Sequence, residues 1–375
     1  MLTNTEQQHY HRQLILDEIG PEGQGLLKKG SVLVIGAGGL GCASLPYLAA
    51  AGIGHIGIVD FDRVDRSNLH RQVLFSVDDI GKNKAVTAAG KLSRLNPHIR
   101  ITPHPSALTA ANARELFSSY DIIVDGSDNF ATRYLVNDAA VMCGKPVIFG
   151  SIFRFEAQLS VFNYRGGPTY RCIFPEPPAP GSSPNCSETG VMGVLPGIAG
   201  TLQANEAIKM ICGTGQVLSG TLLTIDCLTL RMQQFRFTKN VYAVPRRLDH
   251  EYYSCMPHET ATPLLRVADI TGTDPEKTVF IDVRTSSERS RDRIGLHFPQ
   301  FTDLHIPLDT LETQPDRIPE GKNLVFYCQS GIRSRQAADM VQKRFAGVLV
   351  KSLEGGINAL LPLSFRDLTF KQPHK

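Results

Sequence analysis

A glycine-rich turn near the start of the chain has the spacing of a phosphate-binding loop. The apolar run 32–35 leads into Gly36-Ala-Gly-Gly-Leu-Gly41, where Gly36, Gly38 and Gly41 fit the pattern G-x-G-x-x-G. Such a turn lets the backbone approach a phosphate closely, and it aims the N-terminus of the following helix at the ligand. On its own this spacing is a weak signal, so the neighbouring residues must decide which ligand it serves.

A polar loop further along the chain narrows the choice of ligand. It reads Asp60-Phe-Asp-Arg-Val-Asp-Arg-Ser-Asn-Leu-His-Arg-Gln72. A dinucleotide dehydrogenase needs one acid near Asp60 to hold a ribose. It has no need for the other polar residues of this loop, which are Asp62, Asn68, Arg71 and Gln72. These side chains suit a triphosphate and its metal ion.

Further charged residues fall at strand ends and helix starts. Arg12 precedes the first predicted helix, Lys84 lies at the start of another, and Asp128 and Asn129 follow an apolar run. In an open α/β sheet, ligands bind outside the carboxyl ends of the strands. A carboxylate there can hold Mg²⁺ against phosphates, while Arg and Lys neutralise developing charge. Surface charge after a strand is common for any single residue. Four such residues together favour one shared site: Arg12, Arg71, Lys84 and Asp128.

Strand and helix patterns alternate over residues 1–240. The predicted strands are 31–35, 57–60, 99–103, 121–125 and 146–150, and the predicted helices are 43–51, 82–96, 112–117 and 132–143. This order predicts an α/β fold with a doubly wound, mostly parallel sheet, which is Rossmann-like. Antiparallel strands at 156–163 and 220–226 are expected to extend the sheet.

The rest of the chain is predicted to be a linker and a smaller α/β domain. Residues 241–262 are poorly periodic and contain Pro245 and Pro257, which is typical of a linker. A second domain is predicted at 263–375. Its clearest patterns are strands at 279–283 and 324–327 and a helix at 334–344.

Composition argues against several functional classes. The 375 residues carry a net charge of +3 and no long basic run, which argues against nucleic-acid binding. The uncharged stretch 31–59 is long enough for a membrane span, but its glycines predict a buried strand and a covered helix instead. No signal-peptide core precedes it. The eight cysteines form no C-x-x-C pair, which argues against a zinc ribbon and a disulfide framework. We therefore expect a cytoplasmic protein that makes no membrane contact.

A second candidate site surrounds one cysteine of the C-terminal domain. The stretch Cys328-Gln-Ser-Gly-Ile-Arg-Ser334 lies between a predicted strand and a predicted helix. Backbone N–H groups of such a loop converge on the sulfur and, with Arg333, favour the thiolate. This cradle suits a persulfide anion. The residues of this loop are Cys328, Gln329, Ser330, Gly331, Ile332, Arg333 and Ser334.

Residues 5–240 resemble the ubiquitin-activating-enzyme-like adenylyltransferases of the molybdopterin-synthase and thiamine sulfur-carrier pathways. The matching motifs are Tyr10-His-Arg-Gln13, the glycine turn, Ser67-Asn-Leu-His-Arg-Gln72, Lys84, Asp128-Asn-Phe-Ala-Thr-Arg133 and the stretch from Cys186. The resemblance implies that ATP binds over the turn, that Asp60 holds its ribose and that Asp128 binds Mg²⁺. The ATP-binding residues that it implies are Gly36, Gly38, Gly39, Gly41, Asp60, Asp62, Ser67, Asn68, Leu69, His70, Arg71, Lys84, Asp128 and Asn129.

The resemblance also implies a reaction and a homodimer. The reaction is adenylation of the C-terminal glycine of a small ubiquitin-fold protein that ends in Gly-Gly. Each site would take Arg12 from the partner subunit. Cys186 follows a polar run and would accept the acyl group, the alternative being an incidental loop cysteine. The catalytic residues implied by both sites are Arg12, Arg71, Cys186 and Cys328.

Many members of this family bind structural zinc through two C-x-x-C pairs. Here Cys172 remains, Thr169 occupies the position of its partner, and no second pair occurs near residue 245. Because a structural zinc site takes four ligands, the sequence predicts that structural zinc is absent. The remaining alternative is a ligand set of Cys255, His250 and His258.

Residues 264–375 resemble rhodanese sulfurtransferases. The matching residues are the Cys328 loop, Asp282-Val-Arg284, Glu288 and Leu353-Glu-Gly-Gly-Ile357, whereas the usual glycine-histidine step is altered at Arg293-Ile-Gly295. Together the resemblances imply that a Cys328 persulfide converts an activated carrier into a thiocarboxylate in molybdopterin or thiamine biosynthesis. The sulfur donor would be thiosulfate or a cysteine-desulfurase persulfide. Two alternatives are a ubiquitin-like-protein activator with a regulatory rhodanese domain and an NAD-dependent dehydrogenase.

Overall fold

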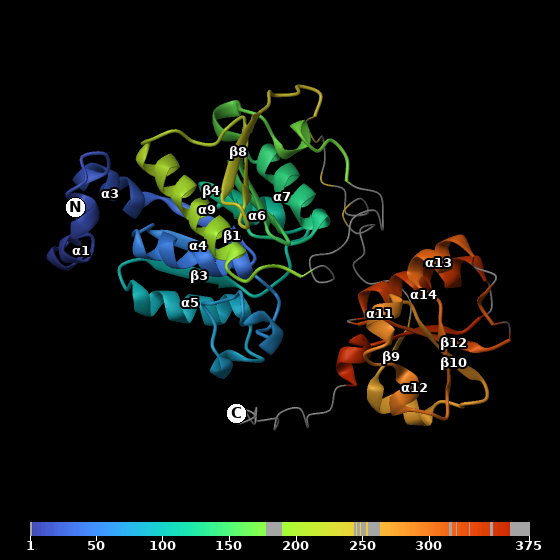
Figure 1. Cartoon of the computed structure of the whole chain (residues 1–375). Helices are drawn as coiled ribbons and strands as arrows, with labels where there is room; N and C mark the ends of the chain where they lie inside the picture. The colour runs from blue at the N-terminus through green and yellow to red at the C-terminus, as the bar shows by residue number, and fades with distance from the viewer. Residues whose placement is uncertain are drawn as a thin grey trace. The chain divides into compact units, whose positions relative to one another are not determined.

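The chain folds into two compact units, Met1–Met256 and Pro257–Lys375 (Figure 1). The computed structural model describes residues 2–177, 190–243, 245, 248, 253, 263–314, 317–319, 321–329, 331–345 and 348–360. Within these ranges no helix is long and apolar enough to cross a membrane.

The first unit is built on one eight-stranded sheet. Its strands are β1 Ser31–Ile35, β2 His55–Val59, β3 Arg100–His104, β4 Ile122–Asp125, β5 Val147–Phe153, β6 Glu156–Phe162, β7 Thr221–Asp226 and β8 Arg231–Arg236. They are ordered β3-β2-β1-β4-β5-β6-β7-β8. The first five strands in this order are parallel, and the pairs from β5 to β8 are antiparallel. The predicted doubly wound sheet with an antiparallel extension is therefore confirmed.

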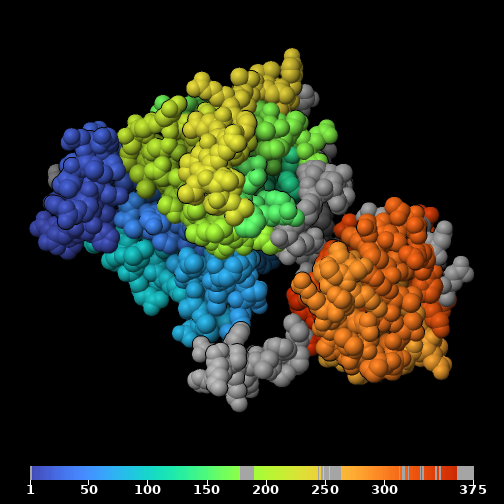
Figure 2. Space-filling model, viewed as in Figure 1, coloured from blue at the N-terminus to red at the C-terminus, as the bar shows by residue number. Residues whose placement is uncertain are grey.

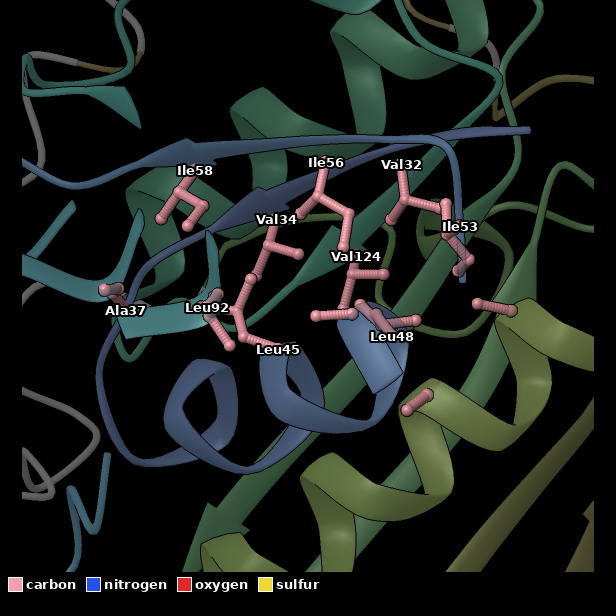
Figure 3. Packing of buried hydrophobic residues seen from close by; sticks show 14 of the residues in the cluster. Val32, Val34, Ala37, Leu45, Leu48, Ile53, Ile56, Ile58, Leu92 and Val124 are labelled. Carbon is pink, nitrogen blue, oxygen red and sulfur yellow. The ribbon is translucent and has the colours of Figure 1, made fainter. Parts of the chain in front are cut away.

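Helices cover both faces of this sheet because successive side chains of a strand point to opposite faces. The helices are α1 Asn4–His9, α2 His11–Leu14, α3 Gly20–Lys29, α4 Gly39–Ala50, α5 Lys84–Leu95, α6 Ala113–Ser118, α7 Phe130–Met142 and α9 Leu195–Cys212. In β1, Val32 and Val34 pack with α4, α5 and α9 (Figure 3). Leu33 and Ile35 pack with α6 and α7 on the other face. Every position of β1 from Val32 to Ile35 is buried.

Helix boundaries differ from the predicted ones where side chains cap them or where glycine packs closely. Helix α5 begins at Lys84, not at residue 82, because the Asn83 side chain accepts a hydrogen bond from the Val86 N–H and caps it. Arg12 does not precede the first helix, since it lies within α2 after α1.

Helix α9 was not predicted, because its glycines and Pro196 suggest a loop. The structure gives these residues another role. A Cβ atom on Gly200 would lie 2.3 Å from the carbonyl oxygen of Leu40 in α4, so glycine permits close helix packing. Pro196 lies in the first turn, where a helix tolerates it.

Strand β8 was also not predicted. All six of its residues are exposed, so the sequence carries no alternation of buried and exposed positions. The yellow segment in Figure 2 includes this strand on the surface of the first unit.

The second unit is a five-stranded parallel sheet. Its strands are β9 Leu264–Leu265, β10 Thr278–Asp282, β11 Thr302–His305, β12 Asn323–Tyr327 and β13 Val350–Leu353, in the order β11-β10-β12-β13-β9. Its helices are α11 Ser286–Arg289, α12 Ile294–His297, α13 Leu308–Thr313 and α14 Ile332–Arg344. The strands predicted at 279–283 and 324–327 correspond to β10 and β12, which are neighbours at the centre of the sheet.

Candidate active sites

The glycine turn lies where the strand order of the first sheet reverses, between β1 and β4. The Gly126 N–H donates to the carbonyl of Ile35, so the loops after these two strands meet. Gly36 has a φ of +90°, and a Cβ on it would lie 3.0 Å from the Gly126 oxygen. A Cβ on Gly41 would lie 2.0 Å from the Gly36 oxygen. The backbone of the turn is therefore tightly packed, with no room for side chains at Gly36 and Gly41. Ligands bind at points where the strand order of an open α/β sheet reverses.

The remaining glycines of the turn differ in what surrounds them. A Cβ on Gly39 would lie 2.9 Å from Pro196 of α9, so Gly39 permits helix packing. For a Cβ on Gly38 the nearest atom would be Nε2 of Gln72, 3.9 Å away, so a methyl group fits without overlap at the N-terminus of α4.

This contrast predicts different effects of two matched substitutions. Gly41→Ala should destabilise the first unit by about 3 kcal/mol, because the methyl group overlaps the Gly36 carbonyl oxygen. Gly38→Ala should leave the melting temperature unchanged and weaken nucleotide binding, because its methyl group enters the space in front of the helix. Thermal unfolding and nucleotide titration would distinguish the two. Equal melting temperatures for both variants would contradict the prediction.

Asp60 joins the glycine turn to the polar loop. Its Oδ2 accepts a hydrogen bond from the Ala37 N–H at 2.7 Å, and its Oδ1 accepts one from the Asp62 N–H at 2.8 Å. Burial raises the pKa of this carboxyl above its ordinary value, although Lys84 and the two N–H groups oppose the shift. A carboxylate held in this way has further lone pairs, which can accept the hydroxyls of a ribose.

Lys84 brings a buried positive charge to the same edge. Its side chain is 7% exposed and lies 3.1 Å from the carboxylate of Asp62, which is 54% exposed. The Asn83 side chain donates to the carbonyls of Asp60 and Asp62. Asn83 was not predicted as a site residue, and its position just before a helical pattern is the signal that could have identified it.

The rest of the polar loop folds over the N-terminus of α4. The short 3₁₀ helix η1 Arg66–Asn68 is capped by Asp65, which accepts from the Ser67 N–H and hydroxyl. Arg71 donates to the Ser67 carbonyl at 3.2 Å, and its Cγ would lie 3.8 Å from a Cβ on Gly39. The His70 ring is 2.9 Å from the same Ser67 carbonyl. Asn68 and Leu69 are half-buried within this loop. The aliphatic part of the Arg71 side chain therefore lies beside Gly39 of the glycine turn, and its guanidinium lies against the Ser67 carbonyl.

Gln72 and Arg133 are two buried polar residues near the site. The Gln72 side-chain oxygen is buried without a hydrogen-bond partner, and the residue is 3% exposed. Arg133 donates to the carbonyl of Ser127, one residue before Asp128, and stacks on Phe149. The polar loop 60–72 indicates Gln72 as a site residue, whereas the sequence contains no separate signal for Arg133 beyond the motif Asp128–Arg133.

The loop after β4 carries the predicted metal ligand. Asp125 is buried, and burial raises the pKa of its carboxyl, which accepts from the N–H and hydroxyl of Ser127. Asp128 follows with an exposed side chain, and Asn129 caps α7 by accepting from the Thr132 N–H. Among the residues that the structure describes in this loop, Asp128 is the exposed carboxylate, and it follows β4, the neighbour of β1, which leads into the glycine turn. An exposed carboxylate beside a phosphate site suits Mg²⁺, which is held by one or two carboxylates and phosphates.

Arg12 lies away from this edge in its own chain. Its neighbour Gln13 donates to the carbonyl of Ala51, at the C-terminal end of α4, whereas the glycine turn lies at the N-terminal end. The helix between them is about 18 Å long, from its 12 residues at 1.5 Å each. Arg12 is exposed there. This placement supports the expectation that each site takes its Arg12 from a second subunit.

Cys186 and the alternative zinc ligands Cys255, His250 and His258 lie outside the described residues. The sulfur of Cys172 accepts hydrogen bonds from the backbone N–H groups of Thr169 at 3.3 Å and Asn240 at 3.2 Å. This thiol thus connects the segment around Thr169 with the segment around Asn240. No group of three or more His, Cys, Asp or Glu residues is placed to hold a metal ion in the described ranges.

We expect purified protein to contain no stoichiometric zinc, because Cys172 is used in hydrogen bonds and Thr169 cannot replace a thiolate ligand. Metal analysis of protein purified without chelator would measure this, with the melting temperature before and after chelation as a control. About one zinc per chain, or a fall in melting temperature on chelation, would contradict the expectation.

The second site surrounds Cys328, which follows the central strand β12 and is 1% exposed. Its sulfur accepts a hydrogen bond from the Gly331 N–H at 3.2 Å, and the Ser334 hydroxyl lies 3.6 Å away. Gly331 has a φ of +90° and caps α14, whose first residue is Ile332. Ser330 lies outside the described residues. On the described side of the loop, one backbone N–H and one hydroxyl thus approach the sulfur.

The backbone of the Cys328 loop packs tightly against Gly356 and Ile357. The Ile357 N–H donates to the carbonyl of Cys328 at 2.9 Å. A Cβ on Gly356 would lie 2.3 Å from that same oxygen, which explains why the chain reads Leu353-Glu-Gly-Gly-Ile357 here.

Charged residues brace the Cys328 loop from two sides. Arg284, 1% exposed, forms a bidentate pair with buried Asp282 and donates to the Gln329 side chain at 3.0 Å. Arg333 donates to both carboxylate oxygens of Glu288, and this pairing lowers the pKa of Glu288 to about 2. Glu288 compensates the charge of Arg333, and the described groups that donate to the sulfur itself are the Gly331 N–H and the Ser334 hydroxyl.

Comparison with known proteins identifies both units. A model of the ThiF family matches residues 10–243, and a model of the rhodanese-like domain matches residues 269–361. The chain is 51% identical over 243 residues to a sulfur carrier protein adenylyltransferase of Thermus thermophilus, covering 64% of this chain and 90% of that protein. It is 41% identical over 373 residues to the probable adenylyltransferase/sulfurtransferase MoeZ of Mycobacterium tuberculosis, covering 96% and 93%.

The solved structures support the fold of the first unit. The crystal structure of E. coli MccB with MccA-N7isoASN superposes with a TM-score of 0.56 at 23% identity, over 62% of this chain and 73% of that one. At this identity the likeness concerns the fold alone.

Proposed function

Because the chain belongs to the ThiF family and carries a rhodanese-like domain after it, we propose that it adenylates a sulfur-carrier protein and then sulfurates it. The enzyme is an adenylyltransferase with sulfurtransferase activity. The observation that carries the proposal is the combination of two sites in one chain. Asp60 accepts from the glycine turn, Lys84 pairs with Asp62 and the Arg71 side chain lies beside Gly39. A second unit holds Cys328 against the Gly331 N–H.

The first step activates the carrier's C-terminal glycine. Its carboxylate attacks the α-phosphorus of ATP, a C–O–P linkage forms, and pyrophosphate leaves. Asp60 would hold the ribose, while Lys84, Arg71 and Arg12 of the partner subunit would offset phosphate charge. Bound Mg²⁺, held by Asp128, would neutralise further charge on the phosphates. The resulting acyl-adenylate is a good electrophile because AMP is a stable leaving group.

The second step transfers sulfur. Thiosulfate or a cysteine-desulfurase persulfide transfers a sulfur atom to Cys328 and so forms its persulfide. The terminal sulfur of this persulfide attacks the acyl carbonyl. AMP leaves, and an acyl disulfide forms. A thiol then attacks the Cys328 sulfur, which releases the carrier thiocarboxylate and leaves a mixed disulfide that a second thiol reduces. Cys186 would accept the acyl group from AMP if a thioester precedes this transfer.

The proposal includes a homodimer and a cytoplasmic location. The distance between Arg12 and the glycine turn of its own chain supports the homodimer. A reducing compartment suits the free thiols of the described cysteines, none of which is disulfide-bonded.

The proposal is tested with a carrier that ends in Gly-Gly, ATP, thiosulfate and a dithiol that reduces the acyl disulfide. Pyrophosphate release and a carrier mass gain of roughly 16 Da, the difference between sulfur and oxygen, are expected. A carrier that lacks its last glycine is the matched control. Adenylation without any mass gain would instead favour a ubiquitin-like-protein activator with a regulatory rhodanese domain, and no reaction with ATP would exclude both.

A further inference from the structure

One face of helix α9 contacts both halves of the proposed ATP site. Pro196, Gly200 and Gln203 lie on this face, because residues three and four positions apart share one side of a helix. A Cβ on Gly39 of the glycine turn would lie 2.9 Å from Pro196. At Gly200 a Cβ would lie 2.3 Å from the carbonyl oxygen of Leu40. These two contacts fix α9 against the glycine turn and along α4 (Figure 1).

Gln203 makes the third contact, about one turn further along the helix. Its side chain is fully buried, and its Nε2 donates to the carbonyls of Asp125 at 2.7 Å and Ile148 at 3.2 Å. These carbonyls belong to β4 and β5, which are neighbours in the sheet. A Cβ on Gly150 would lie 2.6 Å from Nε2, so a side chain there would displace the amide. Gln203 thus binds the end of β4, where the loop to Asp128 begins.

The two ends of the Gln203 amide differ in what they contact. Among the described residues, its Oε1 is buried without a hydrogen-bond partner. An unpaired buried carbonyl is destabilising, and an apolar side chain of similar size would avoid that cost. The two hydrogen bonds that Nε2 donates therefore explain the presence of glutamine at this position.

The residues between Asp125 and Asp128 are held in place one by one. The Gly126 N–H donates to the carbonyl of Ile35 at 2.9 Å. The Ser127 N–H and hydroxyl donate to the carboxylate of Asp125 at 2.9 and 2.6 Å. Because this short loop is held at each residue, the position of Asp128 depends on where Asp125 lies.

We infer that Gln203 is a positioning residue for Asp128 as a ligand of Mg²⁺. This inference rests on the function proposed above, in which Asp128 and the ATP phosphates together hold the ion. Mg²⁺ demands near-ideal octahedral geometry, so the separation between the carboxylate and the glycine turn must be fixed. Helix α9 fixes it, because Pro196 contacts the turn and Gln203 binds the start of the Asp128 loop. Hydrogen bonds that orient metal ligands typically contribute about 10- to 100-fold to metal affinity or activity.

The experiment measures ATP binding to the full chain by calorimetry, without carrier, over a range of Mg²⁺ concentrations and in EDTA. Gln203→Met removes the Nε2 donor and nearly keeps the side-chain size. It should raise the Mg²⁺ concentration that gives half of the metal's effect about tenfold. ATP affinity in EDTA should stay unchanged, because the glycine turn keeps its contact with Pro196. Gly38→Ala, in the turn itself, should instead weaken ATP binding in both conditions.

Three further variants test the connection between Gln203 and the metal. Gly150→Ala keeps the glutamine but places a methyl group against its amide, so it should reproduce the effect of Gln203→Met. In an Asp128→Ala background, Gln203→Met should not change the Mg²⁺ dependence further, since the ligand is already absent. Glu206→Met is the matched control and should leave the Mg²⁺ dependence unchanged. Glu206 is also buried on α9, but its carboxylate accepts from the Leu218 N–H.

The outcomes separate this inference from the proposed function. If the wild-type chain binds no ATP, the proposed adenylation fails and the inference falls with it. If it binds ATP, an unchanged Mg²⁺ dependence in Gln203→Met overturns the inference alone. An equal loss of ATP affinity in EDTA also overturns it, because Gln203 would then be a structural residue only. If Gln203→Met does not fold, the same two criteria apply to Gly150→Ala.

Discussion

Replacing Cys328 by alanine is expected to abolish thiocarboxylate formation and thiosulfate sulfurtransferase activity, while ATP–pyrophosphate exchange continues near its normal rate. The sulfur of Cys328 is the atom that the loop presents to the Gly331 N–H and the Ser334 hydroxyl. The glycine turn and Asp60 lie in the other compact unit, with their own core. Loss of the Cys328 thiol therefore removes the group that bears the persulfide and leaves the adenylation site unchanged.

Mass spectrometry separates the two half-reactions. Wild-type enzyme incubated with thiosulfate should gain roughly 32 Da, one sulfur atom, and Cys328→Ala should gain nothing. Cys227→Ala, which removes a half-buried thiol of the first unit, is the control. Cys186→Ala should spare both exchange and persulfide formation and slow only acyl transfer. A normal rate of thiocarboxylate formation by Cys328→Ala would mean that the second unit is not the sulfur source.

Asp128→Ala is expected to reduce carrier-dependent pyrophosphate exchange by about three orders of magnitude. Removing one preorganised group that offsets phosphate charge typically costs 10²- to 10³-fold in rate, and loss of a metal ligand adds to this. Asp128 is exposed and follows the capped turn of Asp125 and Ser127, so the fold should be unaffected. The measurement is exchange over a range of Mg²⁺ concentrations, and the variant should need more Mg²⁺ than the wild type.

A matched control uses an exposed acid in another loop. Asp78→Ala should leave both exchange and its Mg²⁺ dependence unchanged, since Asp78 lies in the separate 3₁₀ helix η2 Val77–Asp79. Normal exchange in folded Asp128→Ala protein would show that Asp128 is not a Mg²⁺ ligand. The proposed ATP site would then rest on Asp60, Arg71 and Lys84.

The sequence predicted best those features that are local in the chain. The glycine turn and the Cys328 loop each combine a buried strand, a turn and a helix start within about ten residues, so spacing alone identifies them. The alternation of strands and helices gave the doubly wound sheet. Helix α9 was missed because Gly200 and Pro196 resemble loop residues until the opposing helix α4 is known.

Features that depend on distant partners could not be predicted. Tyr253 is 115 positions from the Asp138 that binds it. Its segment has no periodicity that would mark it as buried. Gln203 of α9 similarly donates to the carbonyls of Asp125 and Ile148, and no pattern around it points to those strands. Likewise, the placement of Arg12 beyond the far end of α4 follows from Gln13 and Ala51, which are 38 positions apart.

The position of β1 between β2 and β4 affects the order in which the chain can fold during synthesis. The pairing of β1 with β2 joins Ser31 to His55, but the pairing of β1 with β4 joins Val32 to Ile122, ninety positions later in the chain. Contacts of such long sequence separation form slowly, because the loop between them must close first. A growing chain that has emerged only through β3 carries the complete glycine turn without the Gly126 carbonyl that packs against it. Nucleotide binding should therefore arise abruptly during synthesis, when β4 joins the sheet, and not gradually as the turn residues appear.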